Sequence, residues 1–348
     1  MIKRKQTKEI KIGKVKIGNN NPIAIQSMTN TLTKNTDETI KQIHSLEELG
    51  CEIIRVSVPD IESANALKII KENISIPLIA DIHFDYKLAI QAAKYVDKLR
   101  INPGNIGSEE KIKKVVEEAK QYSLPIRIGI NLGSLEKEIE KNYGLTSIAM
   151  VESAIKNITR LEKLDFNDIV VSLKASDVLR TIEAYKLFSE RSQYPLHLGI
   201  TEAGTLFSGT INSSIGISNL LLQGIGDTIR VSLSASPEEE VKVGKQILQS
   251  LKLRSFGVSI LACPTCARSN FDVELIAKQL EKQTEKIKKP ISIAIMGCGV
   301  NGPGEAKEAD LGIVGGKEGN LFYKKGEIMG RIEEKDIVNN LMNEIEKK

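Results

Sequence analysis

A regular alternation of short apolar runs and amphipathic segments fills the first 250 residues of this chain. The apolar runs are rich in Val, Ile and Leu and recur at intervals of roughly 25 to 30 residues, which is typical of parallel strands joined by crossover helices. Eight strands are predicted, over residues 23–28, 52–58, 77–83, 98–102, 125–131, 168–175, 195–201 and 227–234. Eight such units in about 250 residues predict an α/β fold of the TIM (β/α)8 barrel type.

A second fold class has to be weighed against the barrel, and the chain contains one predicted element besides the eight strand–helix units. A doubly wound sheet also alternates strands and helices, but no G-x-G-x-x-G follows the first strand, so a dinucleotide site has no support. Residues 9–18 alternate apolar and polar side chains around Gly13. We expect them to form a hairpin that caps the bottom of the barrel.

A different pattern begins after residue 250. A strand leads into CPTC, and an amphipathic helix, a second strand into CGVNGPGE, a further strand, a hairpin and a terminal helix follow. We therefore predict a barrel domain over residues 1–250 and a small α+β domain over residues 251–348.

Composition narrows the class of protein. Hydrophobic residues make up 41% of the 348 residues, enough for a large core, and the net charge of +4 gives no reason to expect nucleic-acid binding. No apolar stretch approaches the roughly 18 residues of a membrane helix. The basic N-terminus lacks the apolar segment of a signal peptide, and cysteine is rare. We expect a cytoplasmic protein that binds neither nucleic acid nor membranes.

Basic residues lie within or directly after five of the predicted strands. They are Arg55, Arg100, Arg127, Lys174 and Arg230. The C-terminal ends of barrel strands form the functional face of a TIM barrel, and a buried arginine needs a partner. Arginine binds phosphate oxygens bidentately, so a diphosphate is the simplest shared ligand. The alternative is that some of these cations pair with Asp81, Glu202 or strand-end carbonyl groups.

Polar residues at other strand ends are candidates for proton transfer and for orienting a substrate. They are Asp81, His83, Asn102, Asn131, Thr201, Glu202 and Ser232. Asp81 and His83 are two residues apart and are expected to point the same way. A lone histidine on a strand is more often a core residue than a catalytic one, so a functional role for His83 is supported only by the polar residues near it. Glu202 is the preferred acid or base, with burial and a bound phosphate expected to favour its protonated form and the arginines expected to oppose this.

Three of the four cysteines lie in the second domain. Cys263 and Cys266 form a C-x-x-C pair, and Cys298 lies in MGCGVNGPGE. A four-coordinate site then lacks one ligand, and no histidine follows His197. Glu305, in the glycine- and proline-rich loop after Cys298, is the expected fourth ligand.

A set of three thiolates and one carboxylate suits an iron-sulfur cluster with one exchangeable position better than it suits zinc. Structural zinc and a redox-active thiol pair are the alternatives. Cys51 differs from the other three, since it lies between a helix and an apolar strand and is expected to be a small core residue.

A series of motifs spanning both predicted domains resembles one family. IQSMTNT, IIRVSVP, ADIHFD, RINPGN, SLKAS, GITEAG, RVSLS, CPTCAR and MGCGVNGPGE occur in this order. They are similar to those of the 4-hydroxy-3-methylbut-2-enyl diphosphate synthases in their bacterial two-domain form, iron-sulfur enzymes of the non-mevalonate isoprenoid pathway. The resemblance implies reductive ring opening and dehydration of 2-C-methyl-D-erythritol 2,4-cyclodiphosphate by two one-electron transfers.

The resemblance also implies roles for residues and partners. A 4Fe-4S cluster would be bound by Cys263, Cys266, Cys298 and Glu305, and flavodoxin or ferredoxin would supply its electrons. The arginines and Lys174 would hold the diphosphate. Glu202 would donate a proton to the departing hydroxyl, and the carbon skeleton would be oriented by Asp81, His83, Asn131, Thr201 and Ser232.

Barrel geometry adds an expectation about assembly. The eighth helix ends at the bottom of the barrel, whereas the substrate mouth is at the top. We therefore expect a head-to-tail homodimer in which each cluster domain closes the partner's barrel, and the resemblance implies the same arrangement. Two other functions stay open. One is an iron-sulfur sensor, and the other is a non-redox barrel enzyme with a structural zinc module, similar to dihydropteroate synthase-like barrels.

Overall fold

The computed structural model describes residues 2–347 and divides the chain into two compact units, with the division between Arg254 and Ser255. Unit 1 ends at Arg254 and unit 2 begins at Ser255. Among residues 2–347, no helix combines the length and apolar character needed to cross a bilayer.

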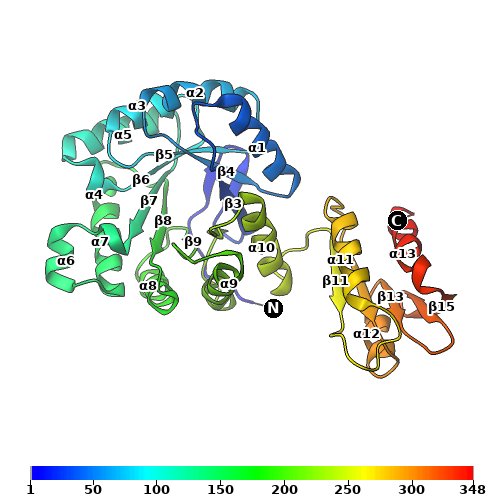
Figure 1. The fold of residues 1–348 in the computed structure, drawn as a ribbon. Coiled ribbons are helices and arrows are strands. Elements are labelled where there is room, and N and C mark those ends of the chain that lie inside the picture. The colour runs from blue at the N-terminus through cyan, green and yellow to red at the C-terminus, as the bar shows by residue number, and fades with distance from the viewer. Residues whose placement is uncertain (1, 348) are drawn as a thin grey trace. The chain divides into compact units, whose positions relative to one another are not determined.

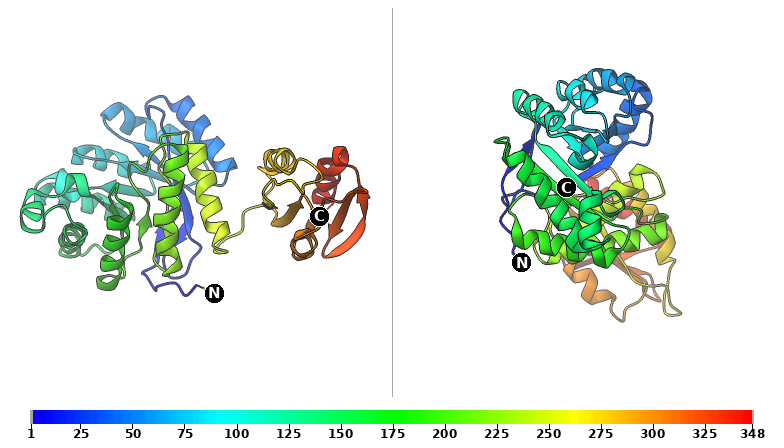
Figure 2. Two further views of the ribbon diagram at one scale, coloured as in Figure 1. Left: turned by 60° about the horizontal axis from the view of Figure 1, so that its bottom comes forward. Right: turned by 90° about the vertical axis from the view of Figure 1, so that its left-hand side faces the viewer.

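Unit 1 is a parallel barrel with helices around its outside (Figures 1 and 2). Its strands are β3 (Ala24–Met28), β4 (Ile53–Ser57), β5 (Leu78–Asp81), β6 (Lys98–Ile101), β7 (Ile126–Asn131), β8 (Ile169–Lys174), β9 (His197–Leu198) and β10 (Thr228–Ile229). They pair in the order β8-β7-β6-β5-β4-β3-β10-β9, and a parallel bridge between Val171 and Leu196 joins the two end strands. The predicted TIM barrel and its eight strands are confirmed.

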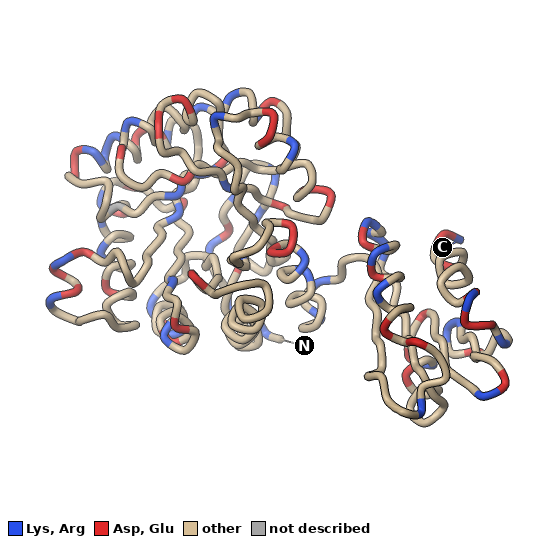
Figure 3. Tube along the Cα trace, in the orientation of Figure 1, with Lys and Arg blue, Asp and Glu red and all other residues tan. Residues whose placement is uncertain are grey.

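Each barrel strand is followed by a helix that covers its outer face. These helices are α1 (Thr36–Glu48), α2 (Ile61–Glu72), α3 (Tyr86–Ala93), α5 (Glu109–Gln121), α7 (Ser147–Glu162), α8 (Val178–Arg191), α9 (Leu206–Leu222) and α10 (Pro237–Ser250). Short insertions at the top of the barrel form α4 (Pro103–Ile106), η1 (Leu132–Ser134) and α6 (Lys137–Tyr143). Figure 3 shows acidic and basic residues intermingled along the outer helices, as solvated faces require.

Aspartate side chains fix where several of these helices begin. Asp60, Asp85 and Asp177 accept hydrogen bonds from backbone N–H groups in the first turns of α2, α3 and α8. Such caps satisfy donors that have no partner within the helix. They therefore define the loops that surround the barrel mouth.

An antiparallel hairpin of β1 (Ile10–Ile12) and β2 (Val15–Ile17) turns at Gly13, whose φ is +54°. Ile10, Ile12 and Ile17 are buried with residues from the first half of barrel strands, among them Ala24 and Ile53. The predicted cap on the barrel bottom is confirmed.

Unit 2 is an α+β domain built on one mixed sheet. Its strands are β11 (Val258–Ala262), β12 (Ile291–Met296), β13 (Leu311–Val314), β14 (Asn320–Lys324) and β15 (Glu327–Ile332), paired in that order. The first three are parallel, and the last two form the predicted hairpin. Its helices are α11 (Val273–Thr284), α12 (Gly302–Glu308) and α13 (Ile337–Glu346), with η2 (Glu334–Asp336) before α13.

Two apolar clusters cover the two faces of this sheet. Ile276 and Leu280 of α11 and Leu341 of α13 are buried together with Ile293 of β12. Ala306 of α12 is buried in a separate cluster that also includes Met296 and Val314. The helix α12 corrects one expectation, because Glu305 was predicted to lie in an irregular loop. A proline in the first turn favours helix formation, and burial of Ala306 anchors that helix on the sheet.

Candidate active site

The five predicted cations lie close together inside the barrel, although Arg127 is near the start of β7 and not at its end. Arg100 of β6 lies opposite Arg127 of β7 in the sheet register, and Lys174 of β8 lies opposite Asn131 of β7. Alternate residues of a barrel strand point inward, so Arg127 and Asn131 share the inner face. Arg127 is only 1% exposed, and Arg55, Arg100 and Lys174 are also buried. The strand register thus places Arg100, Arg127 and Lys174 on three neighbouring strands, and Arg230 directly follows β10.

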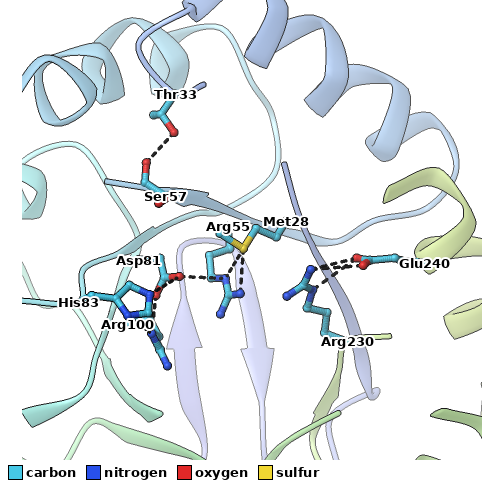
Figure 4. A network of polar contacts seen from close by, with 9 residues as sticks. All are labelled: Met28, Thr33, Arg55, Ser57, Asp81, His83, Arg100, Arg230 and Glu240. Carbon is cyan, nitrogen blue, oxygen red and sulfur yellow. Dashed lines mark hydrogen bonds and ion pairs between the residues drawn. The ribbon is translucent and has the colours of Figure 1, made fainter. Parts of the chain in front are cut away.

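Asp81 at the end of β5 is the centre of a polar network that includes three of the predicted residues (Figure 4). Arg100 Nη1 donates to Asp81 Oδ1 over 3.0 Å, and Arg55 Nε lies 3.8 Å from Asp81 Oδ2. His83 Nε2 lies 3.3 Å from Asp81 Oδ2 and 3.0 Å from Arg100 Nη1. Protonated Nε2 can donate to Asp81, whereas deprotonated Nε2 can accept from Arg100, so the state of His83 decides its partner.

The charges around Asp81 keep it ionised. Burial alone would raise its pKa, but the nearby charge of Arg55, the hydrogen bond with His83 and the charge of Arg100 outweigh burial, and the pKa lies well below its usual value. An ionised Asp81 has no proton to donate. Its geometry is that of a group that orients Arg55, Arg100 and His83.

The cations themselves are electrostatically crowded. Burial lowers the pKa of Arg55 to about 10, although the charge of Asp81 opposes this. Burial also lowers the pKa of Lys174 well below its ordinary value, and the charges of Arg127 and Arg230 add to the effect. The mouth therefore carries more buried positive charge than its carboxylates balance, which favours an anionic ligand.

Two further side chains contact these arginines, and sequence reasoning missed both. The Met28 thioether accepts from Arg55 Nε over 3.1 Å and from Arg55 Nη2 over 2.8 Å. Glu240 of α10 accepts from Arg230 Nη2 over 3.3 Å, although Arg230 was expected to meet only Glu202, Asp81 or carbonyl groups as alternatives to phosphate. Met28 ends a predicted strand, whereas Glu240 lies within a run of three glutamates that gave no sign of an inward side chain.

Glu202 follows β9 and has a φ of +52°. This left-handed conformation is uncommon for a residue other than glycine, and such strain concentrates at functional sites. The Glu202 side chain is exposed, and Thr201 beside it is half-buried. Ser232, which follows β10, is also half-buried at the same end of the barrel. The structure thus places all three at the mouth, on the loops after β9 and β10.

Asn102, another predicted strand-end group, has a structural role. Its side chain accepts from Gly104 N over 3.1 Å and caps α4. The residue is 4% exposed, and its side-chain oxygen stabilises the first turn of α4.

The cysteines of unit 2 lie at one edge of its sheet. Cys263 directly follows β11, and its backbone N–H donates to Ile295 O of β12 over 3.1 Å. Its Sγ accepts from Gly297 N over 3.1 Å, next to Cys298. Cys266 is exposed. Because β11 and β12 are parallel, Cys263 and Cys298 emerge from the same edge.

Glu305 lies in the first turn of α12 and is exposed. Across residues 2–347, no three His, Cys, Asp or Glu side chains are arranged as a metal site. The donor chemistry nevertheless fits an iron-sulfur cluster, since the segments after β11 and β12 carry three unpaired thiols and the helix that follows Cys298 carries the Glu305 carboxylate. Cys51 is a buried core residue as predicted, and burial raises the pKa of its thiol to about 12.

Comparison with known proteins identifies the family. The GcpE TIM-barrel domain profile matches residues 7–245, and the GcpE protein C-terminal domain profile matches residues 259–347. The chain belongs to the GcpE family. A 4-hydroxy-3-methylbut-2-en-1-yl diphosphate synthase (flavodoxin) from Caldanaerobacter subterraneus subsp. tengcongensis is 60% identical over 350 residues, covering 100% of this chain and 99% of that relative. A protein of the same name from Clostridium tetani is 54% identical over 98% of this chain and 99% of its own length.

Solved structures add a likeness of fold. Dihydropteroate synthase from Yersinia pestis, in a complex with a sulfonamide drug, matches 71% of this chain and 100% of its own with a TM-score of 0.53 at 12% identity. The enzyme from Xanthomonas albilineans matches 70% of this chain and 99% of its own with a TM-score of 0.51 at 9% identity. At these identities the likeness concerns the barrel fold alone.

Proposed function

We propose that this GcpE family member converts 2-C-methyl-D-erythritol 2,4-cyclodiphosphate to 4-hydroxy-3-methylbut-2-enyl diphosphate, as an oxidoreductase with the site described above. The name shared by the curated relatives supports the reaction. The family relationship extends over both domains, so a non-redox barrel enzyme with a zinc module is not favoured.

One observation carries the substrate assignment. Five cations converge on the barrel mouth, and the buried carboxylates that face them are Asp81 and Glu240. Uncompensated buried charge is costly unless an anion arrives to pair with it. A cyclic diphosphate presents two phosphate groups on one ring, and arginine forks match phosphate oxygens bidentately. Arg55, Arg100, Arg127, Lys174 and Arg230 are therefore assigned to diphosphate binding.

The remaining polar residues at the mouth would handle the carbon skeleton and the proton. Glu202 is exposed at the rim and can deliver a proton to the departing hydroxyl, which leaves as water. Asp81 orients His83 and Arg100, while Asn131, Thr201 and Ser232 contribute hydrogen bonds to the substrate hydroxyl groups. Positioning of this kind keeps the leaving group beside its proton donor.

Cys263, Cys266, Cys298 and Glu305 are proposed to hold a 4Fe-4S cluster. Such a cluster supplies electrons one at a time, which matches a two-electron reduction by a one-electron donor. The relatives are named for flavodoxin, and we propose flavodoxin, with ferredoxin as the alternative, as the donor for this chain. Its four free cysteines and its donor fit the cytoplasm, whose reducing conditions keep thiols available.

We also propose the head-to-tail homodimer. Arg254 Nη1 donates to Ile23 O over 2.9 Å at the barrel bottom, so the chain is anchored there just before unit 2. Only residues 255–257 separate Arg254 from β11, a reach on the order of 10 Å at roughly 3.3 Å per residue. A cluster domain tethered at the bottom of its own barrel cannot easily reach the mouth at the top. A partner's cluster domain would close it.

Apolar side chains near the mouth support a covering partner. Leu179 at the start of α8 is 75% exposed, and Phe207 at the start of α9 is 78% exposed. Ile211 and Ile215 continue this exposed stripe along α9. Exposed apolar patches of this kind mark interaction surfaces, and a second copy of the chain is the occupant we propose.

Anaerobic preparation of the protein tests the reaction and the cluster together. The protein should be brown, contain iron and sulfide, and convert the cyclic diphosphate when reduced flavodoxin is supplied. A colourless zinc protein would refute the cluster. A brown protein that binds but never turns over the cyclic diphosphate would favour a sensor.

Mixed subunits test the dimer. A Glu202→Gln subunit keeps its cluster residues, and a Cys298→Ala subunit keeps its barrel residues. If each site combines one subunit's barrel with the other's cluster, mixed dimers contain one fully native site and recover activity. Verified mixed dimers that stay inactive would reject the arrangement.

A further inference from the structure

Three consecutive glutamates begin α10, and only one of them is turned into the barrel. Glu238 Oε1 accepts from Ser45 Oγ over 3.5 Å, and Glu239 pairs with Lys242 over 3.2 Å on the helix surface. Glu240 is 5% exposed. Burial of a carboxylate is costly unless hydrogen bonds and an opposite charge compensate it, so the partners of Glu240 define its role.

The Glu240 carboxylate connects α10 to two other segments, β3 and the segment after β10. Oε1 accepts from Leu233 N over 3.0 Å, in the segment after β10. Oε2 lies 3.4 Å from Ser27 Oγ of β3, which is fully buried. Both oxygens lie 3.3 Å from Arg230 Nη2, and Oε2 lies 3.4 Å from Arg230 Nε. The carboxylate therefore restrains the backbone on one side of Ser232 and the guanidinium on the other.

The contacts with Arg230 use one edge of its guanidinium. Within residues 2–347, the hydrogen bonds of Arg230 run through Nε and Nη2. A guanidinium has a second, outer edge formed by its two terminal nitrogens, and that edge is the fork that matches a phosphate. Figure 4 shows Arg230 between Glu240 and Arg55, with one terminal nitrogen directed away from Glu240. The charge of Arg230 also acts on Arg55 and Lys174, so Arg230 lies close to the other cations.

We infer that Glu240 is a positioning residue for substrate binding: it holds Arg230 by its inner edge, directs the outer edge at the diphosphate, and fixes the turn that carries Ser232. The inference rests on the proposed function and adds to it a residue outside the predicted site. It also explains why the negatively charged Glu240 lies close to a site proposed to bind an anion. Without an inner partner, the long Arg230 side chain would adopt several rotamers and lose entropy again when phosphate binds.

The main variant for a test is Glu240→Gln. Glutamine keeps the size of the side chain and can still accept from Leu233 N, but its amide group is a poor partner for the Arg230 donors. Because the diphosphate remains bound throughout the reaction, loss of this contact removes binding that the ground and transition states share. We expect KM for the cyclic diphosphate to rise roughly tenfold, with a smaller change in kcat. The matched control is Glu239→Gln, which removes a neighbouring surface charge and should leave KM unchanged.

A double-mutant cycle separates positioning from a merely structural role. If Glu240 acts through Arg230, Glu240→Gln should weaken binding much less in an Arg230→Met background than in the native chain. Ser27→Ala, which removes a different partner of Glu240, should give a smaller rise in KM and covers the case in which Glu240→Gln fails to fold. Additive effects in the cycle, or a Glu240→Gln enzyme with native KM, would overturn the inference.

These outcomes are distinct from failure of the proposed function. A native enzyme that neither binds nor converts the cyclic diphosphate would refute the function itself. A native enzyme that turns over normally, together with an unaffected Glu240→Gln variant, would refute only the role of Glu240.

Discussion

The barrel mouth of unit 1 and the cysteine edge of unit 2 are built in different ways. At the mouth, four of the five cations project from strands of fixed register, and Arg230 follows β10. Asp81 accepts a hydrogen bond from Arg100, and Glu240 accepts from Arg230. At the cysteine edge, the proposed ligands lie after strands or on a short helix, and Cys266 and Glu305 are exposed. The hydrogen bond from Gly297 N to Cys263 Sγ is the contact that orders a thiol there.

The contrast separates two ways of making a site. A binding site carried by strands is preorganised, because folding of the barrel already orders its side chains. A metal centre made from loop residues couples ligand ordering to metal binding, since binding gathers the ligands. Substitutions at the mouth should therefore alter affinity in a stable scaffold, whereas substitutions at the cysteine edge should decide whether the cofactor is retained.

The largest effect is expected at Cys298. Cys298→Ala should abolish cluster incorporation, because two thiolates and one carboxylate are too few to retain it. Glu305→Ala should keep a cluster that is lost more readily, since three thiolates remain. Iron and sulfide analysis of anaerobically prepared protein measures both, and binding of the cyclic diphosphate to the barrel serves as the control. Equal loss of iron from the two variants would contradict an exchangeable role for Glu305.

The next effect concerns Arg127, the most deeply buried of the cations assigned to the diphosphate. Its Nε and Nη1 have no hydrogen-bond partner within residues 2–347. Arg127→Met should weaken substrate binding by about 1.5 to 3 kcal/mol, the range for hydrogen bonds to charged groups. Iron content should stay native. Arg191→Met, which removes an exposed arginine paired with Glu152, is the matched control for calorimetric titration.

One outcome for the Arg127→Met variant would contradict the claim that the barrel mouth is organised independently of the cysteine edge. If Arg127→Met lost iron but bound substrate normally, the mouth could not be an independent, preorganised anion site.

The sequence predicted the barrel because its strands are buried on both faces and are therefore apolar along their length. The strand-end cations stood out against that background, and alternation placed Asp81 and His83 correctly on one side. Lys98 is fully buried on β6 two residues before Arg100, but in the sequence it was predicted only as the first residue of a strand. The helix α12 was missed because glycine and proline usually interrupt helices, whereas here the proline lies in the first turn and burial of Ala306 anchors the helix on the sheet.

Glu240 could not be predicted for a different reason. Three adjacent glutamates point in three directions around a helix, and sequence alone does not say which of them faces the barrel. The answer depends on how α10 packs against β3 and on the position of Arg230. Long-range packing of this kind leaves no local pattern in the sequence.

A third prediction concerns pH and Lys174. Burial, with the charges of Arg127 and Arg230, lowers its pKa, so the free enzyme loses this charge at a lower pH than an exposed lysine does. A bound diphosphate favours the ammonium form and raises that pKa. Between the two pKa values, binding takes up a proton, and Kd should rise with pH by at most about tenfold per unit.

Calorimetric titration in buffers of different ionisation enthalpy measures the uptake. The phosphates of a cyclic diphosphate are strongly acidic and keep a constant charge across this range, so the enzyme supplies the titrating group. Lys174→Met should bind more weakly and lose the pH-dependent component. Proton uptake that persists in this variant would assign the titration to another group.

The smallest effect is expected in stability, at Lys98. This residue is 0% exposed, and its Nζ has no hydrogen-bond partner within residues 2–347. Burial lowers its pKa well below the ordinary value, and the charges of Arg127 and Arg55 lower it further. Lys98→Met replaces an unfavourably buried amine with an apolar chain of similar length. We expect stabilisation by about 1 to 2 kcal/mol at neutral pH, within the range for replacing buried charges.

The pH dependence of that gain identifies its cause. Between the lowered pKa in the folded state and the ordinary value near 10.5 in the unfolded state, the unfolded chain binds more protons, so native stability rises with pH. The advantage of Lys98→Met should therefore be largest at low pH and shrink as pH rises toward that ordinary value. Thermal unfolding of the native chain, Lys98→Met and the surface control Lys113→Met at several pH values measures it. A destabilised Lys98→Met protein would mean that the barrel interior needs this amine for folding, and the barrel would not be the preorganised partner in the comparison.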